Sequence, residues 1–338
     1  MSSETGRVLR FLTAGKNQTV NYLILLLVAL VVCFALALQD TFLSLGTLQS
    51  MAFQLPELGV LALAMMITLL CGGINLSIIA TANLTSLTIG YLLTHLMPAE
   101  WASAAGIGVI LLAILAGLVV AGLIGLLNGW IIAYVGVSPI LATLGTMTMV
   151  KGISIGLTHG NVISGFPDPI LFIGNGVVLG VPMAVIVFAL CAAPLALLLN
   201  RTPFGIAVYM IGSNEKSTRF SGIDTRRVLL EVYVLSSLLC GIAALVMMSR
   251  FNSANAAYGE SYLLITILAA VLGGVDPFGG FGRVMGLVLA LIILQVISSG
   301  LNLLGLSAHL TLAIWGAILI LVMAVGYLNV RLGGRAAR

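Results

Sequence analysis

The sequence predicts an all-α membrane protein: a bundle of about ten transmembrane helices with both termini in the cytoplasm. Of its 338 residues, 61% are hydrophobic and 7% are charged, whereas a soluble domain is about 45–50% apolar and about 25% charged. Backbone groups in lipid must be hydrogen-bonded within the protein, which leaves helices or closed barrels. The long runs of Leu, Val, Ile and Ala lack the alternation of barrel strands, so helices are favoured.

Each predicted span is an apolar run that approaches the length of about 20 residues needed to cross a bilayer. The first run follows a polar segment and ends in Ala35-Leu36-Ala37, but an uncleaved helix is favoured over a signal peptide because so many runs follow. The runs cover residues 22–38, 56–71, 76–97, 103–127, 138–157, 178–199, 228–249, 261–273, 284–304 and 309–328. Short glycine-rich runs among them can also be half-helices.

The basic residues predict the orientation, because Lys and Arg in short loops favour the cytoplasm. With both termini inside, only Lys151 and Arg250 fall elsewhere. This divides the chain into a cytoplasmic tail (1–20), a transmembrane domain (21–328) and a second cytoplasmic tail (329–338). The 14 basic residues are spread over short segments, which argues against a nucleic-acid-binding face.

One substantial hydrophilic loop, residues 200–227, separates two spans. Apolar side chains such as Phe204, Ile206 and Val208 precede its charged part, and Phe220 and Ile223 lie within that part. A bare linker would not need them. We therefore expect one or two short helices beneath the membrane, with an apolar side that contacts another protein or the membrane interface.

Two polar segments, residues 72–88 and 138–147, are candidates for a solute path. Gly72-Gly73 lets the backbone leave helical geometry beside Asn75 and Ser77, where free backbone groups and side chains can bind a hydroxylated solute. Helix capping and close helix packing explain the same residues equally well. With the later polar positions, the hypothetical path is a neutral channel lined by Asn75, Ser77, Asn83, Thr143 and Thr146.

Gly72-Gly73-Ile74-Asn75 is echoed by Gly273-Gly274-Val275-Asp276, also at the end of a span. The echo is typical of transporters built from internal repeats, but glycine is common in membrane helices, so both explanations stay open.

No catalytic or metal-binding pattern is present. The three histidines are far apart and outside any HExxH motif, the four cysteines lack CxxC spacing, and there is no GxSxG elbow. The only Gly-Lys pair lies in the polar N-terminal tail, so no nucleotide-binding loop is visible. We expect no cofactor in this chain.

Several segments together resemble, in order and spacing, the membrane subunits of sugar-type ABC importers, the branched permease family that serves ribose, xylose, arabinose and galactose uptake. The resemblance extends from about residue 50 to residue 328. Its motifs are GGINLS at 72–77, SPILATLGTM at 138–147, TPFGIAVYMIGSNEKSTRFSGI at 202–223, LAAVLGGVDPFGGFGRVMG at 268–286 and GLNLLGLS at 300–307.

The resemblance implies a multi-pass permease of the bacterial inner membrane that pairs with an identical or different second permease chain in the lipid bilayer. A periplasmic sugar-binding protein would deliver the solute. Separate ABC ATPase subunits, which hold ATP and Mg, would press against the cytoplasmic loop. The implied coupling residues are Gly212, Asn214, Glu215, Ser221, Gly222, Ile223 and Asp224.

Departures from the family pattern limit what it implies. The family usually places an acid at Asn75, and small apolar residues where this chain has Lys216, Ser217 and Thr218. Related permeases serve nucleosides, signalling furanoses and branched amino acids as well as sugars. An ion-gradient-driven secondary transporter is the rival function; such proteins keep ionisable residues in the membrane, yet Glu57 and Glu231 lie near predicted span ends.

Overall fold

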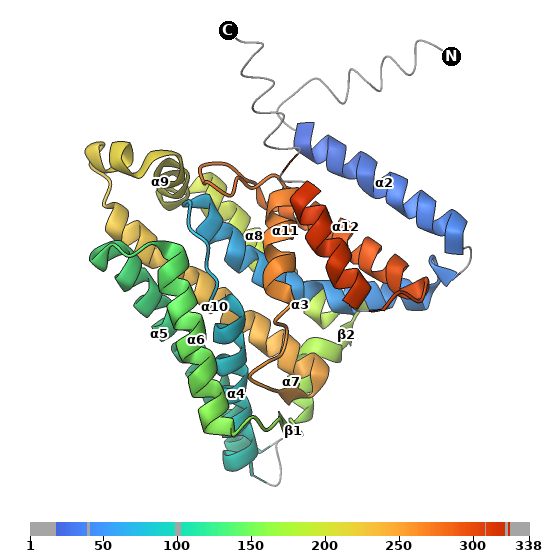
Figure 1. Ribbon diagram of the computed structural model, residues 1–338. Coiled ribbons are helices and arrows are strands. Elements are labelled where there is room, and N and C mark those ends of the chain that lie inside the picture. The colour runs from blue at the N-terminus through green and yellow to red at the C-terminus, as the bar shows by residue number, and fades with distance from the viewer. Residues whose placement is uncertain (1–17, 39–40, 99–102, 308, 322–323, 325–338) are drawn as a thin grey trace, which may run out of the picture.

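The computed structural model describes residues 18–38, 41–98, 103–307, 309–321 and 324. It is a helical bundle (Figure 1). Its long elements are α2 (Gln18–Leu38), α3 (Leu45–Leu70), α4 (Ile78–Leu96), α5 (Ala104–Trp130) with its π-helical extension η2 (Ile131–Val135), α6 (Pro139–Thr158), α7 (Asp168–Asn175), α8 (Met183–Arg201), α9 (Pro203–Phe220), α10 (Thr225–Phe251), α11 (Tyr262–Leu272) and α12 (Val284–Leu303). A further apolar helix spans His309–Leu321.

A helix occupies each predicted apolar run, and seven helices in the described part of the chain are long and apolar enough to cross a membrane. These are α2, α3, α5 with η2, α6, α8, α10 and α12. Of the others, α4 carries several Thr, Ser and Asn residues, and α11 has 11 residues, about 16 Å of helix against a hydrocarbon core of about 30 Å. The helical membrane fold is thus confirmed, while the count of ten spans stays a prediction. The predicted tails, apart from residues 18–20, lie outside the described residues.

One predicted boundary is wrong in a way that matters. The second helix begins at Leu45 instead of residue 56, and Pro56 lies inside it. A proline in a helix interior removes one hydrogen bond and crowds the preceding turn. A helix that is well packed against its neighbours can continue through this local disturbance. Glu57 therefore lies within α3, not at its end, and is 1% exposed.

The core is centred on α3 and α10. Residues 60–67 of α3 are wholly buried, and α10 packs against α3, α4, α5 and α7. Helix α5 approaches α10 closely through glycine: a Cβ at Gly125 would lie 2.7 Å from the Tyr233 carbonyl oxygen. Close backbone approach through small residues is how membrane helices associate when lipid offers no hydrophobic driving force.

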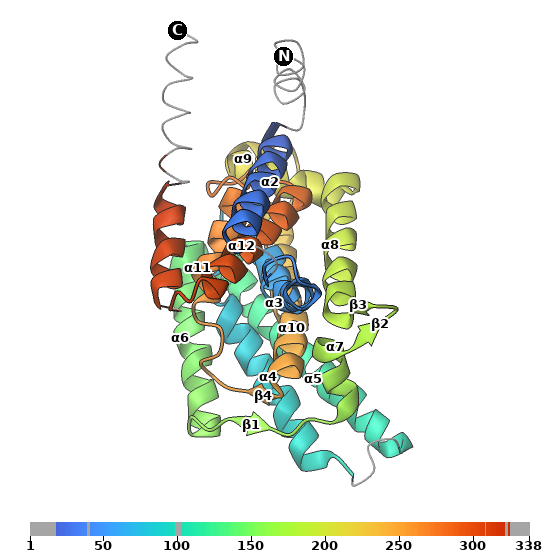
Figure 2. The same ribbon diagram turned by 90° about the vertical axis from the view of Figure 1, so that its right-hand side faces the viewer.

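Helix α9 lies at one end of the bundle, and an unpredicted layer lies at the other (Figure 1). That layer contains α7 and two short antiparallel ribbons, β1 (Ile163–Ser164) with β4 (Ser253–Ala254), and β2 (Val177–Val178) with β3 (Val181–Pro182). Figure 2 shows the same separation from a second direction, with β1 and β4 far below α9.

The two glycine echoes end their helices in the same way. At α3, Gly72 is left-handed (φ 76°) and the Gly73 N–H donates to the Thr68 carbonyl at 3.0 Å. At α11, Gly274 is left-handed (φ 82°) and the Val275 N–H donates to the Ala270 carbonyl at 3.0 Å. Both are Schellman caps. The sequence echo pairs Gly72 with Gly273, whereas the matching caps pair Gly72 with Gly274, so the structural match is shifted by one residue.

The contact between α5 and α10 yields a stability prediction. Gly125→Ala should destabilise the protein by about 1–3 kcal/mol because the new methyl group overlaps the α10 backbone. Gly122→Ala is the matched control on the same helix, since its Cβ would meet only a Leu238 side-chain carbon at 3.7 Å. Thermal unfolding in mild detergent should show a lower midpoint for Gly125→Ala alone; equal midpoints would contradict the packing.

Candidate functional site

The predicted loop between two spans is helix α9, which is broken in the middle. Pro203 occupies the first turn, and the Thr202 hydroxyl caps the helix by accepting the Gly205 N–H at 3.3 Å. Asn214 leaves helical geometry (φ −164°, ψ 101°), and its side-chain oxygen accepts the Ser217 N–H at 2.9 Å. Asn214 therefore caps a second short helix. The expectation of one or two short helices is confirmed.

The first half of α9 is fixed to the bundle by its backbone. A Cβ at Gly212 would overlap the Leu70 carbonyl oxygen and the Gly280 nitrogen, and the Gly280 N–H itself donates to the Leu70 carbonyl at 2.9 Å. The Tyr209 hydroxyl donates to the Gly282 carbonyl at 2.9 Å. Burial raises the pKa of Tyr209, an effect that Arg283 partly offsets, so this donor stays protonated at neutral pH. Helix α9, the end of α3 and the 273–283 loop thus form one junction.

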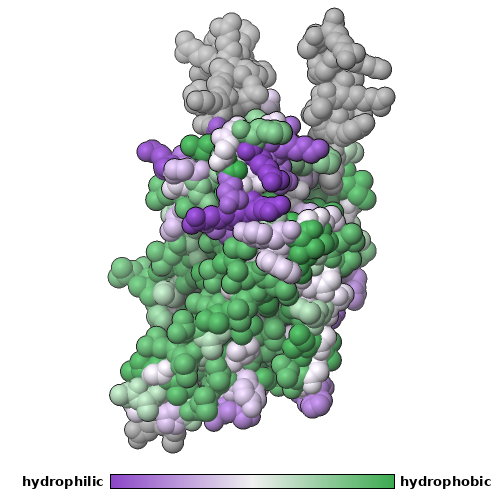
Figure 3. Space-filling model, turned by 90° about the vertical axis from the view of Figure 1, so that its left-hand side faces the viewer, coloured by the Kyte–Doolittle hydropathy of each residue, from purple (hydrophilic) through white to green (hydrophobic). Residues whose placement is uncertain are grey.

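The second half of α9 and the turn after it face outward. Phe220 is 93% exposed, and Gly222 is left-handed (φ 85°) with open space around it. Among the remaining implied coupling residues, Asp224 caps α10, since its carboxylate accepts the Arg227 N–H at 3.2 Å. Ile223 is half-buried, and Glu215 and Ser221 are exposed. Figure 3 shows hydrophilic residues gathered at this end of the molecule above a broad apolar surface.

Three of the five predicted path residues meet in a buried hydrogen-bonded cluster. Asn75 accepts the Ser77 hydroxyl at 2.7 Å and donates to the Ser236 hydroxyl of α10 at 3.1 Å. The Asn128 amide of α5 donates to Ser77 at 2.9 Å. The Thr143 hydroxyl of α6 accepts the Leu76 N–H at 3.1 Å. The connection between α3 and α4 is therefore held by α5, α6 and α10 together.

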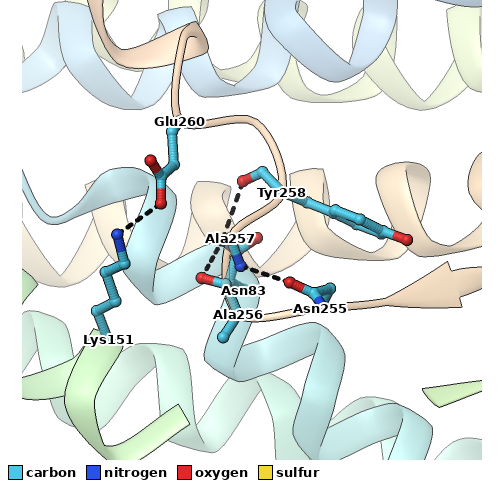
Figure 4. Close-up of polar contacts among 7 residues, drawn as sticks. All are labelled: Asn83, Lys151, Asn255, Ala256, Ala257, Tyr258 and Glu260. Atoms are coloured by element: carbon cyan, nitrogen blue, oxygen red, sulfur yellow. Dashed lines mark hydrogen bonds and ion pairs between the residues drawn. The ribbon is translucent and has the colours of Figure 1, made fainter. Parts of the chain in front are cut away.

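Asn83 of α4 holds a different connection, the one between α10 and α11. Its amide donates to the carbonyls of Ala256 and Tyr258, at 3.0 and 2.9 Å (Figure 4). The fifth predicted residue, Thr146, donates to the Ala142 carbonyl of its own helix at 3.0 Å. All five residues are at most 4% exposed. Their internal hydrogen bonds explain them structurally, and passage of solute along them stays a prediction.

The two basic residues that depart from the orientation pattern each contact an acid. Lys151 of α6 forms an ion pair with Glu260, with 2.6 Å between the charged atoms (Figure 4). Both side chains are partly exposed. Arg250 of α10 lies 2.7 Å from Glu57 of α3, whose side chain is 2% exposed. The Tyr262 hydroxyl of α11 donates to the same Glu57 oxygen at 2.6 Å. Three helices therefore meet at one buried carboxylate.

Sequence reasoning missed Asn128, Ser236, Arg250 and Tyr262 as partners, because each pairs with a residue far away in the chain. Glu57 carried a usable signal: an acid just inside an apolar run is costly in lipid and indicates a buried partner or a function. The boundary placed at residue 56 hid that signal, since an acid at a span end needs no partner.

Comparison with known proteins finds relatives over most of the chain. Residues 47–323 match the family model described as branched-chain amino acid transport system / permease component. The chain is 36% identical over 268 residues to the ribose import permease protein of Bacillus subtilis, covering 78% of this chain and 80% of that protein. It is 33% identical over 272 residues to the autoinducer 2 import system permease protein of Yersinia enterocolitica, covering 79% of each. No solved structure matches the chain.

The buried cluster predicts a structural role for Asn75. Asn75→Ala should cost about 1–3 kcal/mol of stability, because Ser77 and Ser236 lose buried partners. Thr148→Ala is the control, since that exposed hydroxyl binds only carbonyls of its own helix. A lower unfolding midpoint is expected for Asn75→Ala alone. Reduced solute uptake with an unchanged midpoint would instead assign Asn75 to the path.

The two ion pairs predict contrasting costs. Arg250→Ala should destabilise the protein by about 3–5 kcal/mol because it leaves a buried carboxylate without its cation. Lys151→Ala should cost at most about 1 kcal/mol because its pair is solvated. Folded yield and unfolding midpoint in detergent measure both. Comparable losses in the two variants would mean that Glu57 is not charged in the folded protein.

Proposed function

The chain belongs to the branched-chain amino acid transport system permease family, and we propose that it carries a monosaccharide across the membrane as one half of an ATP-driven importer. As a family member it is a multi-pass permease subunit of an inner-membrane ABC importer. The similarity to ribose and autoinducer 2 import permeases over about four-fifths of the chain supports a sugar-like solute over a branched amino acid.

Helix α9 is the observation that carries the proposal. Its first half is fixed to the bundle at Gly212, while Phe220 and Gly222 project from the same end of the molecule. An exposed aromatic side chain on a rigidly held helix is suited to a protein partner. ATP and Mg would be bound by ATPase subunits docked there, and closure of those subunits would reach the permease as a rigid-body shift of α9.

The charges support an orientation with α9 in the cytoplasm. Arg201, Lys216, Arg219, Arg226 and Arg227 lie in or beside α9. At the opposite end, Lys151 and Arg250 are offset by Glu260 and Glu57. Arg227 is paired with Glu231 at 2.9 Å, but within the described residues these five basic residues lie at the α9 end against two at the opposite end, the bias expected of a cytoplasmic face. In this arrangement the ten helical runs cross or enter the bilayer, and a periplasmic sugar-binding protein delivers solute to the end that holds α7.

A second permease chain completes the proposed pore. Helix α6 exposes a row of large apolar side chains, among them Leu141, Leu144 and Leu157, consistent with lipid or a partner permease on that face. The predicted path over Asn75, Ser77, Asn83, Thr143 and Thr146 would open only in a conformation in which their present hydrogen bonds are exchanged.

An ion-gradient-driven transporter is the second candidate, and the buried Glu57 favours it, because intramembrane acids commonly relay protons or bind sodium. Arg250 weakens this candidate, since its guanidinium already occupies one oxygen of the Glu57 carboxylate at 2.7 Å, where a transported cation would bind. Uptake that needs no ATPase and collapses with an ionophore would establish the second candidate.

The ATPase interface can be tested at Gly222. Gly222→Arg should abolish co-purification of an ATPase with the tagged chain in mild detergent and its ATPase activity, because the long side chain enters the interface. Gly222→Asn is the matched control, since Asn tolerates the left-handed backbone that this position requires. Both variants should elute as folded protein on size exclusion. Retention of the ATPase by Gly222→Arg would overturn the proposed docking surface.

A further inference from the structure

The helices enclose a polar cavity that neither the predicted path nor the coupling surface includes. Its volume is about 100 Å³, and its lining comes from α3, α10, α11, α12 and the helix His309–Leu321. The polar lining residues are Gln54, Glu57, Arg250, Tyr262, Gln295 and Ser298. So many polar groups inside an apolar bundle are costly, and intramembrane ionisable residues commonly mark a solute or ion site.

The cavity lies in the half of the bundle away from α9. Arg250 is 25 residues along α10 from Thr225, which follows α9, and this corresponds to about 37 Å of helix. Ser298 lies in the later part of α12, which starts from the loop that contacts α9. With the proposed orientation, the cavity lies toward the side from which solute arrives.

Hydrogen-bonding capacity remains open at the cavity. Arg250 and Tyr262 both bind one oxygen of Glu57, and the second oxygen has no hydrogen-bond partner within the described residues. Gln295 is held through its own side-chain NH2 group, which donates to the Gln54 side-chain oxygen at 3.3 Å and to the Ser299 hydroxyl at 3.2 Å. A buried carboxylate oxygen without a partner is unfavourable unless water or a ligand donates to it.

The lining indicates the chemical class of the ligand. Glu57 and Arg250 neutralise each other at 2.7 Å, so the cavity favours a neutral molecule over an ion. Carboxylate, guanidinium, amide and hydroxyl groups together offer both donors and acceptors. Trp315, 4% exposed, adds an aromatic face to the same wall. Adjacent donors, acceptors and an aromatic face fit a molecule with several hydroxyl groups on an apolar ring.

A wider space adjoins the cavity. A second space of about 450 Å³ shares Ile265, Ser298 and Trp315 with it. This space is lined further by polar residues, including Asn302 and Thr311. Ser298 and Trp315 thus stand between a wider polar space and the narrow end at Glu57.

We propose that this cavity is a low-affinity binding site for a neutral polyhydroxylated solute, with Glu57, Gln295 and Ser298 as hydrogen-bonding groups and Trp315 as the aromatic wall. The inference rests on the proposed function, because it assigns that function a solute site. The solute donates one hydroxyl proton to the side-chain oxygen of Gln295, whose NH2 group already binds Gln54 and Ser299. It donates a second to the free Glu57 oxygen, which a side-chain rotation must first expose to the cavity.

Direct occupancy can be measured with a thiol introduced by Ser298→Cys in the full chain reconstituted in liposomes. A water-soluble methanethiosulfonate reagent should modify it faster than the four native cysteines of the unsubstituted chain. Millimolar D-ribose, D-xylose or D-galactose should slow the modification severalfold, and leucine should not. Thr94→Cys, at the exposed end of α4, is the control whose modification no sugar should slow. An inert thiol at position 298, or one that no sugar protects, would overturn the site.

Transport provides the second measurement, made on the complete importer with the radiolabelled sugar it takes up. Gln295→Leu and Ser298→Ala should each lower the maximal rate of uptake severalfold, because the binding protein sets the solute concentration for half-maximal uptake and the cavity acts after delivery. Thr94→Ala, which also removes one hydroxyl, should leave uptake unchanged. ATPase co-purification should be normal in all three variants. Unchanged uptake in both cavity variants would contradict the inference.

The two proposals fail in different ways. Sugar uptake by the unsubstituted importer, with no protection at position 298 and no effect of Gln295→Leu, would retain the proposed function and reject this site. Protection by leucine instead of sugars would reject both the ligand class and the sugar assignment. Protection by a sugar without ATP-dependent uptake would retain the site and reject the importer.

Discussion

The absence of a side chain at position 212 is the constraint on which the α9 end of the structure depends. Any Cβ there would overlap the Leu70 carbonyl and the Gly280 nitrogen, so glycine is what lets α9 lie against the end of α3. The same approach allows the Gly280 N–H to bond to Leu70 at 2.9 Å and Tyr209 to reach Gly282. Loss of this contact would separate the outward-facing coupling surface from the helices it has to move.

Helix α3 extends from that junction into the middle of the bundle. From Leu70 to Glu57 is 13 residues of one helix, about 20 Å, and residues 60–67 between them are completely buried. A helix packed on all sides cannot bend independently of its neighbours, because close-packed interiors transmit displacement. The junction that holds α9 and the cavity at Glu57 thus lie at two points on one rigid element, the arrangement that a rigid-body transport mechanism needs.

Several site features could be predicted from sequence because their causes are local. The amphipathic character of residues 200–227 follows from neighbouring side chains, and α9 confirms it. The left-handed caps at Gly72 and Gly274 follow from glycine itself. The start of α3 could not be predicted in this way, because the apolar run begins at residue 56 and only tertiary packing sustains the helix that enters it from Leu45. That single difference moved Glu57 from a span end to the core.

By itself, the sequence determined the membrane environment, the helical class and the asymmetry of charge along the chain, because these depend on composition and on spacing within one segment. The tertiary structure decided which polar groups meet. Asn75 binds Ser236, and Asn83 binds the carbonyls of Ala256 and Tyr258. Glu57 binds Arg250 and Tyr262. A polar group in lipid must find a partner, but which partner it finds depends on helix packing between residues more than 150 positions apart. No pattern within a single span contains that information.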